Sequence, residues 1–66
     1  MLTNQCQSIV NNSIYHIETQ CDYNNIPDMI IESEASKIKK TLKKYNYPKK
    51  YIDEATREFL SYFNYD

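Results

Sequence analysis

Glycine is absent from this 66-residue sequence. Loops that cradle phosphate groups and turns that require positive φ depend on glycine, so a nucleotide-binding loop of that kind is excluded. A sheet built from tight hairpins is also disfavoured, because two-residue hairpin turns favour Asn-Gly, Asp-Gly and Gly-X pairs. The sequence therefore predicts neither a glycine-dependent ligand site nor a hairpin-rich sheet.

Cysteine and long apolar runs are scarce as well. The two cysteines, Cys6 and Cys21, are too few for a disulfide scaffold. On one helix they would lie roughly 22 Å apart, too far for a disulfide. We expect buried thiols, with intermolecular bridging or metal ligation as the alternatives. No run reaches the ~18 apolar residues of a membrane span and no signal peptide is apparent, so we expect a soluble, cytoplasmic protein.

Length and composition predict one small globular domain over residues 1–66. A chain of this size buries only about 60% of the surface of its unfolded form, so the core is thin. Apolar residues make up 41% and charged residues 26%, which is ordinary for a soluble domain. The net charge of -1 favours neither nucleic acid nor a membrane surface as a partner.

The first segment lacks charge, since residues 1–17 contain no Asp, Glu, Lys or Arg. Its apolar residues recur in steps of three and four, as on one helix face, at Leu2, Cys6, Ile9, Val10, Ile14, Ile17 and Cys21. We predict a helix over residues 3–20, capped by Thr3 or Asn4. Two alternatives stay open. Residues 13–23 are rich in β-branched and aromatic side chains and could be extended, and the uncharged surface could form a homodimer seam.

A second helix is predicted over residues 28–45, beginning at Pro27 or Asp28 after a turn at Asn24-Asn25. Its apolar stripe steps by four and three through Ile31, Ala35, Ile38, Leu42 and Tyr45. Acidic residues occupy its N-terminal half and lysines its C-terminal half, the polarity that the helix dipole prefers. Glu34 and Lys37 are spaced as an i,i+3 ion pair.

A short turn leads into a third helix, predicted over residues 49–63. Asn46 is the best available residue for the left-handed position that closes a helix, and Pro48 keeps Tyr47 out of the helical region. The third apolar stripe is formed by Ile52, Ala55, Phe59, Tyr62 and Phe63. So short a turn requires the two helices to pack together. The predicted fold is all-α: a small three-helix bundle, or a helical hairpin plus an N-terminal helix.

Side chains for catalysis or metal binding do not form a recognisable set. His16 is the only histidine, and no Cys-x-x-Cys or His-x-x-x-His spacing is present. The sequence places no carboxylate beside this imidazole, and no nucleophile-base pair can be built. We therefore predict no enzyme activity, no metal site and no cofactor.

Seven of the eight basic residues fall between Lys37 and Lys50. With the nearby tyrosines, these lysines could bind a nucleic-acid backbone while the rings stack on bases. They could equally be a solvated helix face that follows the dipole preference.

Tyrosine is abundant, with seven in the chain. Packing at the core edge is expected for Tyr45, Tyr51 and Tyr62, and exposure for Tyr23, Tyr47 and Tyr65. Exposed tyrosine is a typical interface residue. The candidate partner-binding residues are Lys39, Lys40, Lys43, Lys44, Tyr47, Lys49, Lys50 and Tyr51.

Two motifs stand in order within residues 38–60: Leu42-Lys43-Lys44-Tyr45-Asn46-Tyr47-Pro48, then Glu54-Ala55-Thr56 and Leu60. They resemble the extreme C-terminal helical region of one branch of type I restriction enzyme R subunits, the motor and nuclease subunits. That region has a basic helix, a Leu-Arg/Lys-Lys-Tyr-Gly-Tyr-Pro turn, and an acidic helix with Glu-Ala-Thr and a following Leu. Asn46 replaces the usual glycine, and asparagine tolerates the same left-handed geometry. Residues 1–30 match nothing in that family.

The resemblance implies a non-catalytic helical module for assembly with the methyltransferase and specificity subunits. The nuclease and helicase motifs are absent, so neither ATP hydrolysis nor DNA cleavage is expected from this chain. Its start at Met1 suggests an excised C-terminal domain or a free-standing small protein. The alternatives are a phage or mobile-element inhibitor of a host defence complex (restriction or CRISPR), and a nucleic-acid-binding protein using the lysines of residues 37–50.

Overall fold

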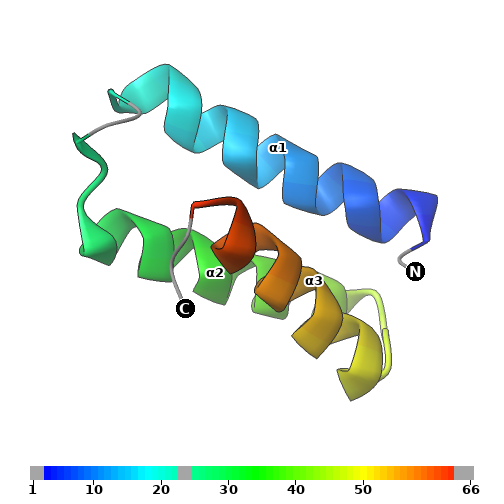
Figure 1. Cartoon of the computed structure of the whole chain (residues 1–66). Helices are drawn as coiled ribbons and strands as arrows, with labels where there is room; N and C mark the ends of the chain where they lie inside the picture. The colour runs from blue at the N-terminus through cyan, green and yellow to red at the C-terminus, as the bar shows by residue number, and fades with distance from the viewer. Residues whose placement is uncertain (1–2, 23–24, 64–66) are drawn as a thin grey trace.

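The computed structural model describes residues 3–22 and 25–63, and within them the chain forms three helices. These are α1 (Asn4–Gln20), α2 (Asp28–Lys44) and α3 (Lys49–Tyr62) (Figure 1). No strand occurs in these two ranges, so the all-α prediction is confirmed. The predicted ranges were 3–20, 28–45 and 49–63. Each differs from the observed helix by one residue, at one end only.

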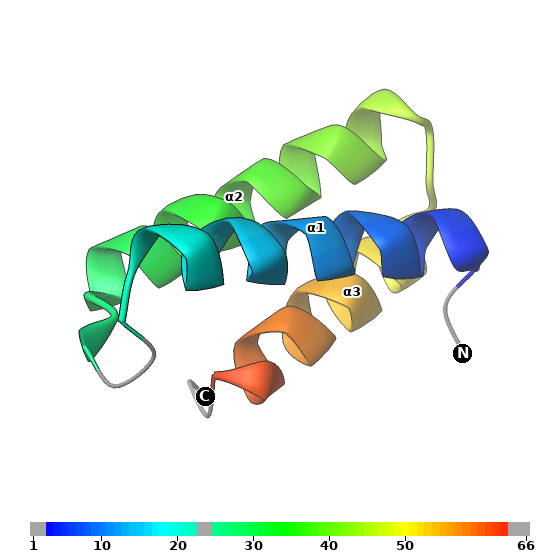
Figure 2. The same cartoon turned by 90° about the horizontal axis from the view of Figure 1, so that it is seen from above.

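Each helix packs against both of the others, and the bundle measures 33 × 20 × 19 Å (Figures 1 and 2). α1 and α3 run in the same direction. α2, which comes between them in the sequence, runs in the opposite direction. All three helices contribute to one core, made by Cys6, Val10, Ile17, Ile31, Ala35, Ile38, Leu42, Ala55 and Phe59. Because the core is shared, no helix buries its apolar face alone.

α1 begins at a threonine cap. The Thr3 Oγ1 accepts a hydrogen bond from the backbone N–H of Cys6 at 3.2 Å, so the cap is Thr3 and not Asn4. The helix continues unbroken to Gln20. The extended alternative for residues 13–23 is therefore wrong over its helical part, because the helical spacing of the apolar residues outweighs their β propensity.

The two thiols differ in burial, and both are free. Cys6 is fully buried in the core, as expected. Cys21 is only half-buried, so the expectation of a buried thiol fails there; it lies at the C-cap of α1, where the backbone has turned extended. Three predicted features lie outside the described residues: the place of Leu2 in the apolar stripe, the exposure of Tyr23 and the turn at Asn24.

α2 starts directly after Pro27, whose carbonyl oxygen accepts hydrogen bonds from the N–H groups of Ile30 and Ile31 at 3.0 and 3.3 Å. The predicted stripe is buried at Ile31, Ala35, Ile38 and Leu42. It does not extend to Tyr45, which is 55% exposed and not at the core edge. Tyr45 is the C-cap residue, so the helical period that defines the stripe ends there.

The α2–α3 turn is a Schellman motif. Asn46 has φ 64°, the left-handed conformation predicted for it. The N–H of Tyr47 donates to the carbonyl of Leu42 at 3.1 Å, and the N–H of Asn46 donates to that of Lys43 at 3.0 Å. These two bonds satisfy carbonyls that the end of α2 would otherwise leave unpaired. Pro48 then caps α3 with an extended backbone.

α3 buries Ala55, Thr56 and Phe59 against the other helices. The Thr56 hydroxyl donates to the carbonyl of Ile52 at 2.8 Å, so this polar side chain is satisfied inside the bundle. The stripe prediction fails at Tyr62, which is 45% exposed. Its hydroxyl can therefore lie outside the core, where it donates a hydrogen bond to α1.

Candidate partner interface

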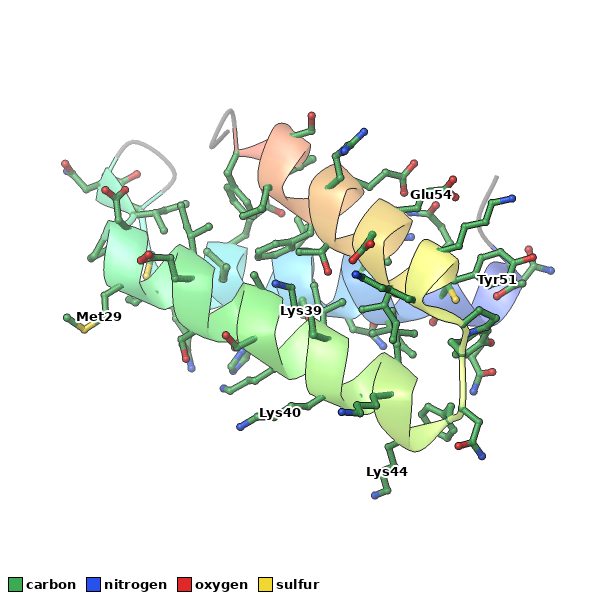
Figure 3. The ribbon with its side chains drawn as sticks, turned by 90° about the horizontal axis from the view of Figure 1, so that it is seen from below. Met29, Lys39, Lys40, Lys44, Tyr51 and Glu54 are labelled. Carbon is green, nitrogen blue, oxygen red and sulfur yellow. The ribbon has the colours of Figure 1, made fainter. Side chains whose placement is uncertain are left out.

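The candidate lysines are all exposed, but they do not form one continuous surface. On α2, Lys40 and Lys44 extend outward on the flank away from α3 (Figure 3). Lys37 is three residues before Lys40 and shares that side. We call Lys37, Lys40 and Lys44 the outer lysine face. All three side chains are exposed.

Lys39 lies on the other flank of α2. Together with Asp53, Arg57 and Leu60 of α3 it lines a shallow pocket of about 350 Å³. Lys43, one turn further along, continues this flank. The charges there are mixed, because Asp53 offsets part of the positive potential of Lys39 and Arg57. The outer lysine face is offset in the same way, because Lys37 pairs with the Glu34 carboxylate at 3.0 Å.

Lys49 and Lys50 occupy the first turn of α3, where no acidic residue is present. A helix N-terminus carries partial positive charge, so cations at this position are disfavoured. Lys43 and Lys44 differ, because they lie in the last turn of α2, where the dipole favours them. Dipole preference thus accounts for Lys43 and Lys44 but not for Lys49 and Lys50.

Tyr47 is not fully exposed, so the prediction of exposure was wrong. It is half-buried, and its hydroxyl donates to the Gln5 Oε1 at 2.6 Å and lies 3.3 Å from the Thr3 Oγ1. Its ring meets that of Tyr51 edge-on, with centroids 6.0 Å apart. The two contacts of the Tyr47 hydroxyl hold the α2–α3 turn against the start of α1. Tyr65, also predicted to be exposed, lies outside the described residues.

His16 has a carboxylate beside it, contrary to the sequence prediction. Its Nδ1 lies 3.5 Å from the Glu34 Oε1, and the Glu34 Oε2 pairs with Lys37 at 3.0 Å as the i,i+3 spacing predicts. The Glu34 side chain is only 8% exposed. The sequence missed the contact because it joins α1 to α2, and only the helix packing brings the two residues together. No described group of three or more His, Cys, Asp or Glu is placed to hold a metal ion.

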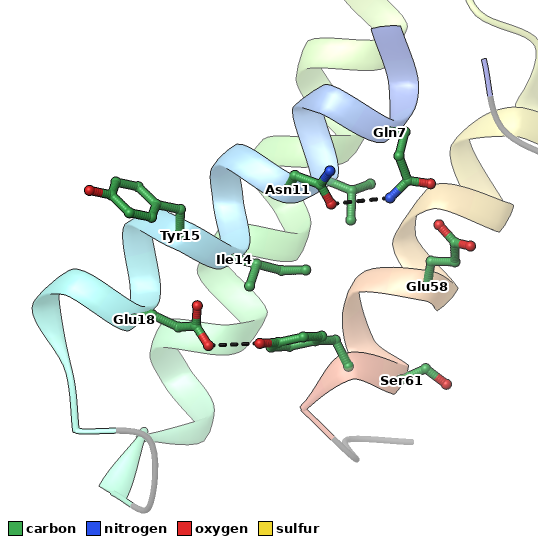
Figure 4. Close-up of a pocket in the computed structure, with 9 residues that line it drawn as sticks. Gln7, Asn11, Ile14, Tyr15, Glu18, Glu58 and Ser61 are labelled. Atoms are coloured by element: carbon green, nitrogen blue, oxygen red, sulfur yellow. Dashed lines mark hydrogen bonds between the residues drawn. The ribbon is translucent and has the colours of Figure 1, made fainter. Parts of the chain in front are cut away.

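Two large exposed side chains were not assigned any role from the sequence: Tyr15 at 69% and Met29 at 80% exposure. Both fall off the apolar stripes, so their exposure follows from the helical period. The sequence signal that could have identified them is an aromatic or thioether side chain on the polar side of a predicted helix. Tyr15 borders a groove between α1 and α3 (Figure 4).

None of the helices in the described residues is long and apolar enough to cross a membrane. The described site consists of exposed cations, half-buried tyrosines and one contact between His16 of α1 and Glu34 of α2. No protein-family model matches the chain, and neither a curated protein nor a solved structure matches it.

Proposed function

We propose that this chain is a non-catalytic, cytoplasmic module for protein-protein interaction. In this proposal it acts like the C-terminal assembly segment of a type I restriction R subunit and binds the methyltransferase and specificity subunits. The observation that carries the proposal is the α2–α3 hairpin, whose residues 38–60 resemble the motifs of that segment.

The geometry of the hairpin supports this reading. Asn46 replaces the glycine of the motif, and its φ of 64° is the conformation in which glycine is usually required. Leu42 and Ala55 are both fully buried in the shared core. Tyr47 closes the turn through its hydroxyl bond to Gln5. The motif residues therefore have physical roles in one helix-turn-helix unit.

The contact surface in this proposal is the outer lysine face together with the lysines at the start of α3. Tyr47 and Tyr51 pack against each other and are half-buried, so their rings are poorly placed to stack on bases. The lysines then act through charge, which suits an acidic protein surface. Charge complementarity of this kind sets the association rate and the choice of partner.

Retention of a purified methyltransferase–specificity complex by the immobilised chain tests the proposal. The double variant Lys40→Gln/Lys44→Gln should weaken retention about twofold to thirtyfold, because each exposed pair contributes ~0.2–1 kcal/mol. The matched control is Ser8→Glu/Asn12→Glu, which changes net charge by the same amount on exposed positions of α1. Failure to retain either subunit, or equal losses in both variants, would refute the proposal.

Affinity purification from cells at two salt concentrations separates the rival functions. Restriction-modification subunits in the eluate favour the proposed module. A different defence complex in the eluate favours an inhibitor. Nucleic acid that is lost at higher salt favours a backbone-binding role for the lysines, because such binding falls steeply with ionic strength.

A further inference from the structure

The side of the bundle formed by α1 and α3 carries an open groove of about 580 Å³ (Figure 4). α1 lines it from Gln7 to Glu18, and α3 lines it with Glu58, Ser61 and Tyr62. α2 contributes no lining residue and lies behind the groove. The groove is therefore separate from the outer lysine face, and the inference below does not depend on the restriction-subunit proposal.

The floor of the groove is apolar and its ends are polar. Val10 and Ile14, one helical turn apart, form the apolar part. At one end the Gln7 Nε2 donates to the Asn11 Oδ1 at 3.1 Å. Tyr15 also borders the groove, but its ring projects from the side of α1 that faces away from α3 (Figure 4). An apolar strip with polar ends is the composition of a protein contact site.

The charge of the groove is entirely acidic. Glu18 and Glu58 are its charged lining residues, and no Lys or Arg lines it. Glu58 forms no ion pair with any described residue. Tyr62 donates its hydroxyl to the Glu18 Oε2 at 2.7 Å, which fixes this carboxylate while leaving its other oxygen available. An occupant that places cations at these carboxylates is favoured, and an acidic one is repelled.

The shape of the groove favours a helical occupant. Two helices running in the same direction form its walls, and the described chain has no sheet edge to which a strand could add. The Tyr62 side chain crosses from α3 to Glu18 of α1 and closes that end of the groove (Figure 4). From Gln7 to Tyr15 the remaining length is about 12 Å at ~1.5 Å per residue, which matches roughly two turns of a fourth helix. A helix laid there would complete a four-helix arrangement.

We propose that the α1–α3 groove binds a basic amphipathic helix of a partner protein. Its apolar residues, spaced i,i+4, contact Val10 and Ile14, and its Lys or Arg side chains pair with Glu18 and Glu58. A second copy docking through the same groove is disfavoured, because the twofold arrangement would bring these carboxylates toward their own equivalents.

A labelled helical peptide of three to four turns, with leucines at i,i+4 and lysines elsewhere, serves as the probe in fluorescence anisotropy. We expect it to bind, and a peptide with glutamate in place of lysine not to bind. Glu58→Lys should weaken binding about threefold to tenfold. Glu32→Lys is the matched control, since it makes the same charge change on an exposed position of α2.

Equal weakening by Glu58→Lys and Glu32→Lys would overturn the site, since it would indicate general attraction between charges. Binding that is the same for the two peptides would also overturn it. If sedimentation shows that the chain alone self-associates and Glu58→Lys abolishes this, the occupant is a second copy and the partner assignment is wrong. Circular dichroism of each variant confirms that the helices are retained. Because the lysine variants do not alter this groove, failure here leaves the proposed function testable by itself.

Discussion

Replacement of Leu42 by alanine tests whether the shared core holds the three helices together. Leu42 of α2 is fully buried in the core that all three helices share. A buried Leu→Ala change costs ~2–5 kcal/mol, through lost transfer free energy and the cavity left behind. At roughly 0.05–0.15 kcal/mol per residue, a domain of 66 residues has a total stability of about 3–10 kcal/mol. The variant therefore loses a large share of its stability and is partly unfolded at the lower end of this range.

Urea denaturation followed by far-ultraviolet circular dichroism measures the effect. Met29→Ala is the control, because it also truncates an apolar side chain of α2 but at a position that is 80% exposed. We expect its effect to stay within ~0.5 kcal/mol. The slope of the transition should be unchanged in the control, so that midpoints report stability alone. A loss below ~1 kcal/mol for Leu42→Ala, or equal losses in the two variants, would refute the shared core.

Three further changes test the turn and the interhelix ties, each by the same urea titration. Asn46→Gly should leave stability unchanged or raise it, whereas Asn46→Ala should lower it by ~1 kcal/mol because alanine resists positive φ; equal losses would contradict the left-handed turn. Tyr47→Phe should cost about 0.5–1.5 kcal/mol through loss of the hydrogen bond to Gln5, with a smaller effect in Gln5→Ala/Tyr47→Phe than the sum of the single changes. Glu34→Leu should stay within about 1 kcal/mol of the wild type, because the side chains of its partners His16 and Lys37 are 50% and 63% exposed and remain solvated after the change; a loss of several kcal/mol would show that these contacts of Glu34 are essential.

The helical fold was predictable because its signals are local. The steps of three and four through Ile31, Ala35, Ile38 and Leu42 depend only on the helical period, and they place the buried face of α2 correctly. The left-handed geometry of Asn46 also followed from a local requirement, since the turn needs such a residue and the chain has no glycine. Where the period ends, the prediction failed: Tyr45 lies at the cap, and its ring leaves the stripe.

Contacts between helices were not predictable in the same way. The approach of His16 to Glu34 and the bond from Tyr47 to Gln5 each join residues far apart in the chain. They depend on how α1 is rotated and shifted against the hairpin, which one sequence does not specify. The lysines illustrate the same difficulty. Their clustering in the sequence suggested one patch, yet Lys39 and Lys40 project from different flanks of α2.

The motif that resembles the restriction subunit is largely made of residues that shape the hairpin. Leu42 and Ala55 are buried, Asn46 sets the turn, and Thr56 bonds to its own helix. Any hairpin of this geometry needs such residues, so the motif specifies the fold of the segment more strongly than it specifies a partner. Partner choice must depend on the exposed positions around it. Substitutions on the outer lysine face, which leave these buried residues in place, are therefore the changes that separate an assembly module from a hairpin used for another purpose.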